Sequence, residues 1–557
     1  MQFFSISVFK GFAERSRKSP VPRKWLLGLL WVGLMGLGLP TMAESAATAQ
    51  GAATSSSRFD WSKVPPVTPM PRLGGFLLPP SGPGYYSLWD QLTSNYRSAP
   101  PIAPYTPFGL YPPSFFDVDF RYLEKPDNQQ KDFFDPVKRI HLGDNWLLSL
   151  GGSFWIRHMD EGNSRLTTQD NDYDLVRTRL YGDLWYRDNA RLFVEFLDAH
   201  SFHEELPPLA IDVNRSDLLN LFADVKVGTV QGAPAYLRVG RQELLYGSQR
   251  LISTLDWANT RRTFQGAKAF WHGEQFDLDV FWTRPVVADP SNFDEWDEDR
   301  DFAGIWGTYR PMKGHFIDLY FLSLDDDRKV APGSGGLLGD SNIYTAGARY
   351  AGDYNHILWE LEGMYQFGDW SNQDLSAGAV AAGAGYHFAA LPMNPQLWVR
   401  YDYASGDSNP GQGDTRSTFN QLFPFGHYYL GFLDRVGRQN INDFNIQLAA
   451  YPMPWLTTIF QYHHFWLANE KDALYNAAGQ PSRRDPTGQA GNDVGDEIDF
   501  RFNVHVSSHQ DIFFGYSKLF AGDYIAQSFP VTNGVLGTQR GPDVSPDLFY
   551  FQYVFRF

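Results

Sequence analysis

Hydrophobic and polar side chains alternate along most of the chain from Trp146 onward, in segments of about ten residues. Because successive side chains of a β-strand point to opposite faces, this alternation predicts strands with one apolar and one polar face. We expect eighteen such strands. Nine lie at 146–158, 174–187, 190–202, 217–227, 235–246, 262–272, 275–284, 301–310 and 315–325, and nine at 342–350, 356–367, 375–388, 396–405, 440–451, 456–468, 496–506, 511–519 and 548–557.

The last ten residues, LFYFQYVFRF, show the pattern most strongly. One face of this strand is aromatic throughout, and the other is mixed. In a soluble β-sandwich, the alternative for this strand, the aromatic face would need a core to cover it. A strand that closes a barrel in a bilayer can leave that face against lipid. We therefore predict that the aromatic face serves barrel closure and assembly; it consists of Phe549, Phe551, Tyr553, Phe555 and Phe557.

Several other strands place charged residues on one face only. Ile498, Phe500 and Phe502, for example, alternate with Asp499 and Arg501. A charge facing lipid at mid-bilayer costs about 2–4 kcal/mol, so the charged face is expected to point inward. Short connections alternate with long ones, as in outer-membrane barrels, and an open soluble sheet curls or splits well before this size. The sequence thus predicts an all-β fold, a transmembrane antiparallel β-barrel of about 18 strands with an irregular Pro-rich N-terminal extension.

One long apolar run lies near the start of the chain, at Trp25–Leu39. Basic residues precede it, and Thr41-Met42-Ala43 follows it as a small-x-small cleavage pattern. This order predicts a secretory signal peptide over residues 1–43. An inner-membrane anchor is the weaker alternative, because the apolar run is short for a spanning helix.

Residues 44–115 are predicted to form a Ser/Ala-rich linker and a Pro-rich extension on the periplasmic side. The prolines of 61–113 disfavour helices and ladder strands, although Tyr86–Arg97 is compatible with a short helix. The extension is either a plain spacer or a segment that docks on a partner or inserts into the barrel mouth. The barrel with its long extracellular loops is expected to take up residues 116–557.

Composition excludes several classes of function. The chain has no Cys, so it has no disulfide framework or thiolate metal site. Its net charge of −16 argues against nucleic-acid binding, which needs basic surface. The acidic runs at 294–299 and 325–327 match no defined calcium loop, so we expect solvated loops and no metal site. No nucleophile elbow, P-loop or dinucleotide fingerprint is present, and we predict neither catalysis nor a cofactor.

Residues 239–270 read VGRQELLYGSQRLISTLDWANTRRTFQGAKAF. This block resembles the alginate export family of outer-membrane porins, and the stretches 116–128, 134–152 and 419–441 are also similar to members of that family. The resemblance implies a monomeric eighteen-stranded barrel whose lumen passes a linear, negatively charged uronate polymer outward. The Pro-rich stretch 61–113 departs from a simple export porin.

A polymer with one carboxylate per sugar needs cations along its path, and the planar fork of Arg binds both carboxylate oxygens. Alternation places seven basic residues on inward faces: Arg177, Arg179, Arg238, Lys268, Arg400, Arg501 and Arg556. Arg250, Arg261 and Arg262 lie in or beside the loop of the family block, where they line a constriction or hold the loop in place. The alternative for each is structural pairing with a lumen carboxylate, and Asp402 lies two residues from Arg400. The alternation changes phase near Gly240, which indicates a bulge or a strand end.

Three functions fit these features. The first is an outer-membrane porin that passes an alginate-like uronate polymer or its fragments through an arginine-lined lumen. The second is an uptake porin for other solutes, and the third is a secreted carbohydrate-binding or glycan-degrading β-protein. We favour the first, as a monomer in the outer membrane of a Gram-negative-type bacterium. Its expected partners are outer-membrane lipid and an anionic polysaccharide, with a periplasmic partner for the extension as an open alternative.

Overall fold

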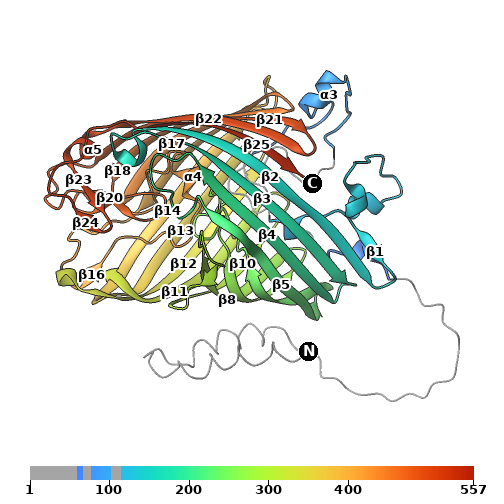
Figure 1. Cartoon of the computed structure of the whole chain (residues 1–557), viewed down its shortest axis with the longest axis horizontal. Helices are drawn as coiled ribbons and strands as arrows, with labels where there is room; N and C mark the ends of the chain where they lie inside the picture. The colour runs from blue at the N-terminus through green and yellow to red at the C-terminus, as the bar shows by residue number, and fades with distance from the viewer. Residues whose placement is uncertain (1–58, 67–76, 102–113) are drawn as a thin grey trace, which may run out of the picture. The chain divides into compact units, whose positions relative to one another are not determined.

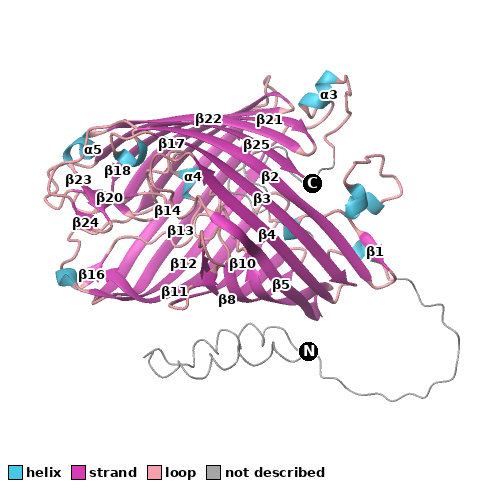
Figure 2. Ribbon diagram, viewed as in Figure 1, coloured by secondary structure: helices cyan, strands magenta, loops and turns pink. Residues whose placement is uncertain are grey.

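The computed structural model describes residues 59–66, 77–101 and 114–557. The predicted signal peptide, residues 1–43, lies outside these ranges. In the described part of the chain, eighteen antiparallel strands form one closed barrel (Figures 1 and 2). The barrel closes where β2 (Trp146–Gly162) pairs with β25 (Asp547–Arg556), so that no edge is left unpaired. The predicted fold class is confirmed.

Each of the eighteen predicted segments corresponds to one barrel strand. Between β2 and β25 the barrel strands are β3 (Asn171–Tyr186), β4 (Ala190–Phe202), β5 (Asn214–Val230), β6 (Ala233–Gln242), β7 (Phe264–His272), β8 (Phe276–Val287), β10 (Arg300–Tyr309), β11 (Phe316–Pro332), β12 (Leu338–Tyr354), β13 (Ile357–Trp370), β14 (Gln373–His387), β15 (Gln396–Ala404), β17 (Ile441–Met453), β18 (Leu456–Leu467), β21 (Asp493–Ser507) and β22 (Gln510–Ala521). Several run past their predicted ends, most of all β11 and β12, whose pairing continues to Pro332 and Leu338. Most of the stretch between the two predicted segments, residues 326–341, therefore belongs to these two strands and extends the β11–β12 hairpin.

The connections contribute smaller elements. The short strands are β1 (Ile140–Leu142), β9 (Glu295–Trp296), β16 (Thr415–Arg416), β19 (Ala473–Tyr475), β20 (Pro481–Arg484), β23 (Phe529–Thr532) and β24 (Val535–Leu536). The helices are α3 (Leu88–Leu92), α4 (Gly426–Tyr429), α5 (Asp523–Gln527) and the 3-10 turns η1 (Trp61–Lys63), η2 (Phe115–Asp117), η3 (Arg121–Glu124), η4 (Asp135–Val137), η5 (Ser164–Leu166) and η6 (Ser334–Gly336). Among the described residues, no helix is both long and apolar enough to span a membrane.

The two ends of the barrel differ in their connections. At the end where β2 begins and β25 finishes, short turns join the strands; we call this the turn end, and it lies beside the label C in Figure 1. At the opposite end, the loop end, the connections include two long loops. Loop A (residues 243–263) joins β6 to β7, and loop B (residues 405–440) joins β15 to β17.

The two faces of the barrel wall differ in polarity as the alternation predicts. On β13, Leu361 and Tyr365 are about half exposed, whereas Glu360 and Glu362 are buried. The same division recurs on β15, where Val399 is exposed and Arg400 is buried. An apolar outer face and a charged interior are what a barrel in lipid requires.

The terminal residue of the chain lies at the seam. The backbone of Phe557 exchanges two hydrogen bonds with Gly152 of β2, each of 2.9 Å. Its ring lies 5.3 Å from the ring of Phe134, and Phe549 and Phe551 of the same strand are exposed on the outer face. The C-terminal strand is therefore held to β2 up to its last residue.

We expect Phe557→Ser to lower the yield of closed barrel, because it removes the aromatic contacts that hold this end of the seam. Burial of a large apolar side chain contributes about 1.5–3 kcal/mol, and a half-buried ring contributes part of that. The measurement is the fraction of protein that migrates as a compact species on an unheated gel. Phe549→Ser, at the loop end of the same strand, is the matched control; equal yields for both variants would remove the special role of Phe557.

Candidate functional site: the barrel lumen

Loops A and B fold into the barrel and bind each other. Ser253 N donates to Phe423 O at 3.0 Å, and Phe423 N donates to Leu251 O at 2.9 Å, which makes a short parallel bridge. Phe425 N donates to Gln249 O at 2.8 Å. The two loops therefore form one unit inside the lumen, which we call the loop partition.

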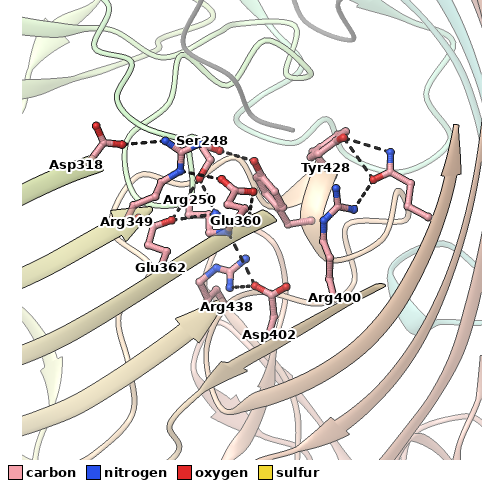
Figure 3. Close-up of polar contacts among 12 residues, drawn as sticks. Ser248, Arg250, Asp318, Arg349, Glu360, Glu362, Arg400, Asp402, Tyr428 and Arg438 are labelled. Carbon is pink, nitrogen blue, oxygen red and sulfur yellow. Dashed lines mark hydrogen bonds and ion pairs between the residues drawn. The ribbon is translucent and has the colours of Figure 1, made fainter. Parts of the chain in front are cut away.

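Buried ion pairs fix the loop partition to the wall formed by β11 to β15 (Figure 3). Arg250 of loop A binds Glu362 at 2.9 Å and Glu360 at 3.0 Å. Arg349 of β12 bridges Glu360 and Asp318, at 2.8 and 2.9 Å. Burial opposes the charge of Arg250, but Glu360 and the acidic groups around it hold its pKa well above the ordinary value. Arg250 thus joins loop A to β13, while Arg349 pairs with carboxylates of the neighbouring wall strands.

Loop B is attached to the same wall. Arg438 pairs with Asp402 of β15, and Tyr429 donates through its hydroxyl to Ser248 O of loop A at 2.7 Å. Arg400, by contrast, binds Gln447 and lies with its guanidinium carbon 4.6 Å from the ring of Trp398. Asp402 thus pairs with a loop arginine and not with the strand arginine two residues away.

On the opposite wall, loop A contacts β3 and β4. Arg177 Nη2 donates to Asp256 Oδ1 at 3.0 Å. The side-chain amide of Asn259 donates to three backbone carbonyls, those of Val176, His200 and Asp212. Loop A thus reaches from β3 and β4 to β13 across the lumen.

The other two arginines of the family block also serve the loops. Arg261 Nε donates to Glu243 Oε1 at 2.6 Å, so it ties one end of loop A to the other. Arg262 Nη1 donates to Pro424 O of loop B at 3.1 Å, and burial lowers the pKa of Arg262 to about 9. These contacts support the second sequence-based interpretation of these residues, that they hold the loop in place.

Beside the loop partition lies a pocket lined by arginine, which we call the arginine pocket. Its empty volume is about 510 Å³, counting the part open to solvent. The lining residues are Arg157, Arg177, Arg179, Arg501 and Arg556, with Phe115, Ser153, Trp155, Asp256, Trp257, Phe513, Gln552 and Val554. Asp256 is the one carboxylate among these described lining residues, so positive charge predominates around the pocket.

Three of the pocket arginines have carboxylate partners. Besides the Arg177–Asp256 pair, Arg179 Nε donates to Glu195 Oε1 at 2.6 Å, and Arg556 Nη1 donates to Asp511 Oδ2 at 2.5 Å. Glu195 and Asp511 are not among the residues that line the pocket. They fix the guanidiniums in position while the pocket surface stays cationic.

A column of stacked groups shapes one side of the pocket. The guanidinium carbon of Arg157 lies 3.7 Å from the ring centroid of Trp257 and 4.5 Å from that of Trp155. Arg177 lies on Trp155 at 4.6 Å, and the His427 ring of loop B stacks on Trp257 at 3.8 Å. Arg157 also donates to Gln552 Oε1 at 2.7 Å and to Trp257 O at 2.8 Å. Stacking on tryptophan holds the guanidiniums flat and partly desolvated, which strengthens their interaction with an anion.

All seven predicted strand residues face the interior, but the structure brings only four of them together. Arg177, Arg179, Arg501 and Arg556 line the pocket. Arg238 instead forms a two-point pair with Asp224, at 2.7 and 2.9 Å. Lys268 pairs with Asp279 at 3.4 Å, and Arg400 binds Gln447 of β17.

The change of phase near Gly240 marks a strand end. Gly240 has a φ of +132°, and β6 ends two residues later at Gln242. Arg241 then binds Leu218 O at 3.0 Å at the loop end, and Glu243 is already part of loop A. The phase change is therefore the point at which the chain leaves the wall for the lumen.

Sequence reasoning missed the aromatic half of the pocket. Trp155 and Arg157 share the inward face of β2 with Ser153, so alternation alone places them in the lumen. Trp257 belongs to a loop, and no period in the sequence indicates where its ring lies. Within the described ranges, no group of three or more His, Asp or Glu side chains is arranged to hold a metal ion.

The family model described as "Alginate export" matches residues 146–538, which is most of the chain. This chain belongs to the alginate export family. Together with the closed barrel, this makes it an outer-membrane porin, a transport channel. The family predicted from residues 239–270 is thereby confirmed.

Several solved bacterial proteins have a similar fold. OccD3 (OpdP) of Pseudomonas aeruginosa is 12% identical, with a TM-score of 0.47 over 73% of this chain and 91% of that one. OprD of Pseudomonas aeruginosa is 11% identical, with a TM-score of 0.44 over 73% and 94%. OccAB2 of Acinetobacter baumannii is 11% identical, with a TM-score of 0.46 over 73% and 98%. No curated protein matches the chain.

Proposed function

We propose that this porin passes an anionic polysaccharide, an alginate-like uronate polymer or its fragments, through its lumen. The arginine pocket is the observation that carries the proposal. Five guanidiniums surround a space lined by a single carboxylate, Asp256. A uronate chain presents one carboxylate per sugar, and arginine binds carboxylates through two parallel hydrogen bonds.

The aromatic side of the pocket supports an anionic cargo. Trp155 and Trp257 line the same space as the arginines, and each holds a guanidinium against its face. This stacking keeps the guanidiniums flat and partly desolvated, which strengthens their interaction with a carboxylate.

Arg157 is the pocket arginine best placed to bind a carboxylate. Its hydrogen-bond acceptors in the pocket include a side-chain amide oxygen, of Gln552, and the backbone carbonyl of Trp257. A carboxylate is a stronger acceptor for a guanidinium than either group. We propose that the porin works as a monomer, with outer-membrane lipid around the barrel.

Ionic current through single channels in a planar bilayer tests this function. We expect uronate oligomers to block the current, and neutral oligosaccharides of equal length to leave it unchanged. Arg157→Gln is expected to weaken the block about tenfold, since a hydrogen bond to a charged group contributes about 1.5–3 kcal/mol. Arg284→Gln, on the outer face near the loop end, is the matched control. If uronates do not block the current, the protein is still a porin, but the result favours the other candidate, an uptake porin for different solutes.

A further inference from the structure

Residues of the N-terminal extension pack inside the turn end of the barrel. Trp61 and Val64 are buried against inward side chains of β2, β3, β6 and β7, namely Leu147, Trp185, Tyr236 and Phe270. Leu78 is packed against Ala351, Leu358 and Trp398 on β12, β13 and β15. These two groups of strands lie across the barrel from each other in the order of the sheet. The described residues of the extension therefore contact both sides of the turn-end mouth.

Hydrogen bonds fix the extension on the side of β15. Leu78 N donates to Gln396 Oε1 at 3.2 Å, and Gln396 Nε2 donates to Leu78 O at 2.9 Å. Gln396 is itself buried on the inward face of its strand. The side-chain amide of Gln396 therefore binds both the backbone N–H and the backbone carbonyl of Leu78, which fixes Leu78 against β15.

The deepest part of the extension is the segment 114–124, which we call the plug segment. The ring of Phe115 stacks on Tyr181 at 4.9 Å, and Phe116 packs edge-on against Phe222 at 5.3 Å. Phe120 belongs to the same buried cluster. Phe115 also lines the arginine pocket, so the plug segment lies between that pocket and the turn end of the barrel.

The plug segment covers cationic groups of the wall. The guanidinium carbon of Arg179 lies 4.3 Å from the ring centroid of Phe115, and that of Arg238 lies 4.8 Å from Phe116. Arg191 Nη2 donates to Phe116 O at 2.9 Å. Arg179 of the pocket, together with Arg191 and Arg238, is thus contacted by the two phenylalanines.

The described contacts of these two phenylalanines differ in kind from those of the loop partition. Aromatic packing, cation–π contacts and a backbone hydrogen bond hold Phe115 and Phe116. Buried ion pairs hold loops A and B. Arg179, Arg191 and Arg238 form their ion pairs with Glu195, Asp183 and Asp224 of the wall, so displacement of the two phenylalanines breaks no ion pair.

We propose that residues 114–124 are a displaceable plug that closes the turn end, and that an anionic chain entering the arginine pocket displaces it. Displacement removes the rings from Arg179 and Arg238 and the Phe116 carbonyl from Arg191, which lets an anionic chain reach these guanidiniums. This inference rests on the proposed function for the identity of the cargo, but closure of the turn end does not depend on it.

A single engineered cysteine tests closure, because the chain has no Cys of its own. Ser153→Cys places a thiol in the arginine pocket, where a charged maleimide reports access. We expect slow labelling in the otherwise unchanged protein and several-fold faster labelling when Phe115→Ala and Phe116→Ala are added. Phe133→Ala, an 87% exposed residue of the same extension, is the matched control and is expected to leave the rate unchanged.

If the Ser153→Cys protein labels at the same rate with and without the two phenylalanine substitutions, and both barrels are correctly folded, the plug proposal is wrong. Compact migration on an unheated gel identifies the folded barrels. If the double variant does not fold, Phe115→Leu provides the test, since it keeps apolar volume but loses the ring that stacks on Arg179. Labelling is measured without uronate, so the two proposals can fail separately. If the double variant labels faster but uronates do not block the current, the plug is supported and the uronate cargo is refuted. If the labelling rate is unchanged but uronates block the current, the cargo is supported and the plug is refuted.

Discussion

Replacing Arg250 with alanine is expected to detach the loop partition from β13 and to raise the single-channel conductance several-fold. Arg250 is buried between Glu360 and Glu362, and its removal leaves both carboxylates with fewer partners. Breaking a buried ion pair by removing one partner costs about 3–5 kcal/mol. That is enough to favour an arrangement in which the loops leave the wall and water reaches the carboxylates.

Conductance in a planar bilayer measures this effect, and two further variants make it specific. Arg250→Lys keeps the charge but not the fork that reaches both carboxylates, so we expect an intermediate conductance. Arg328→Ala removes an arginine that is 38% exposed and paired with Asp326, and an exposed pair of this kind contributes about 0–1 kcal/mol. If Arg250→Ala conducts like Arg328→Ala, the ion pairs to β13 do not hold the partition.

Changing Arg177 and Arg179 together to alanine is expected to shift the channel toward cation selectivity. The change removes two positive charges from the pocket and leaves Asp256 and Glu195 without these partners. At an effective dielectric constant of about 20, a unit charge about 4 Å from a passing ion changes its energy by about 4 kcal/mol.

The reversal potential in a salt gradient reports this selectivity. Arg187→Ala with Arg215→Ala is the control for charge, because both of these arginines are exposed outside the pocket. A reversal potential that moves equally in both double variants would mean that the net charge of the protein, and not the pocket, sets the selectivity.

The barrel wall could be predicted from the sequence because lipid and lumen impose a period of two on every strand. Each inward residue of the wall, from Arg177 on β3 to Arg556 on β25, follows from this rule. The ends of the strands are predicted less accurately than their positions. β11 and β12 continue beyond the predicted segments, because the hairpin pairs through Asp326 and Ser341 without any lipid-facing constraint.

The contents of the lumen could not be predicted, because they depend on contacts between distant segments. The block around Arg250 indicated a family, but its partners Glu360 and Glu362 lie on a strand more than a hundred residues later. Trp257 and Phe115 meet the pocket from a loop and from the extension, where no periodicity operates. Trp61, Val64 and Leu78 of the Pro-rich stretch likewise pack on inward side chains of the wall, which no pattern in that stretch indicated.

The packing of the extension has a consequence for the order in which the molecule matures. Trp61 and Phe115 precede every barrel strand in the chain, and the side chains they pack on come from β2 to β7. Contacts between segments far apart in the chain form late, because the entropy of closing the chain between them opposes early pairing. We therefore expect the extension to insert only after this part of the wall has assembled.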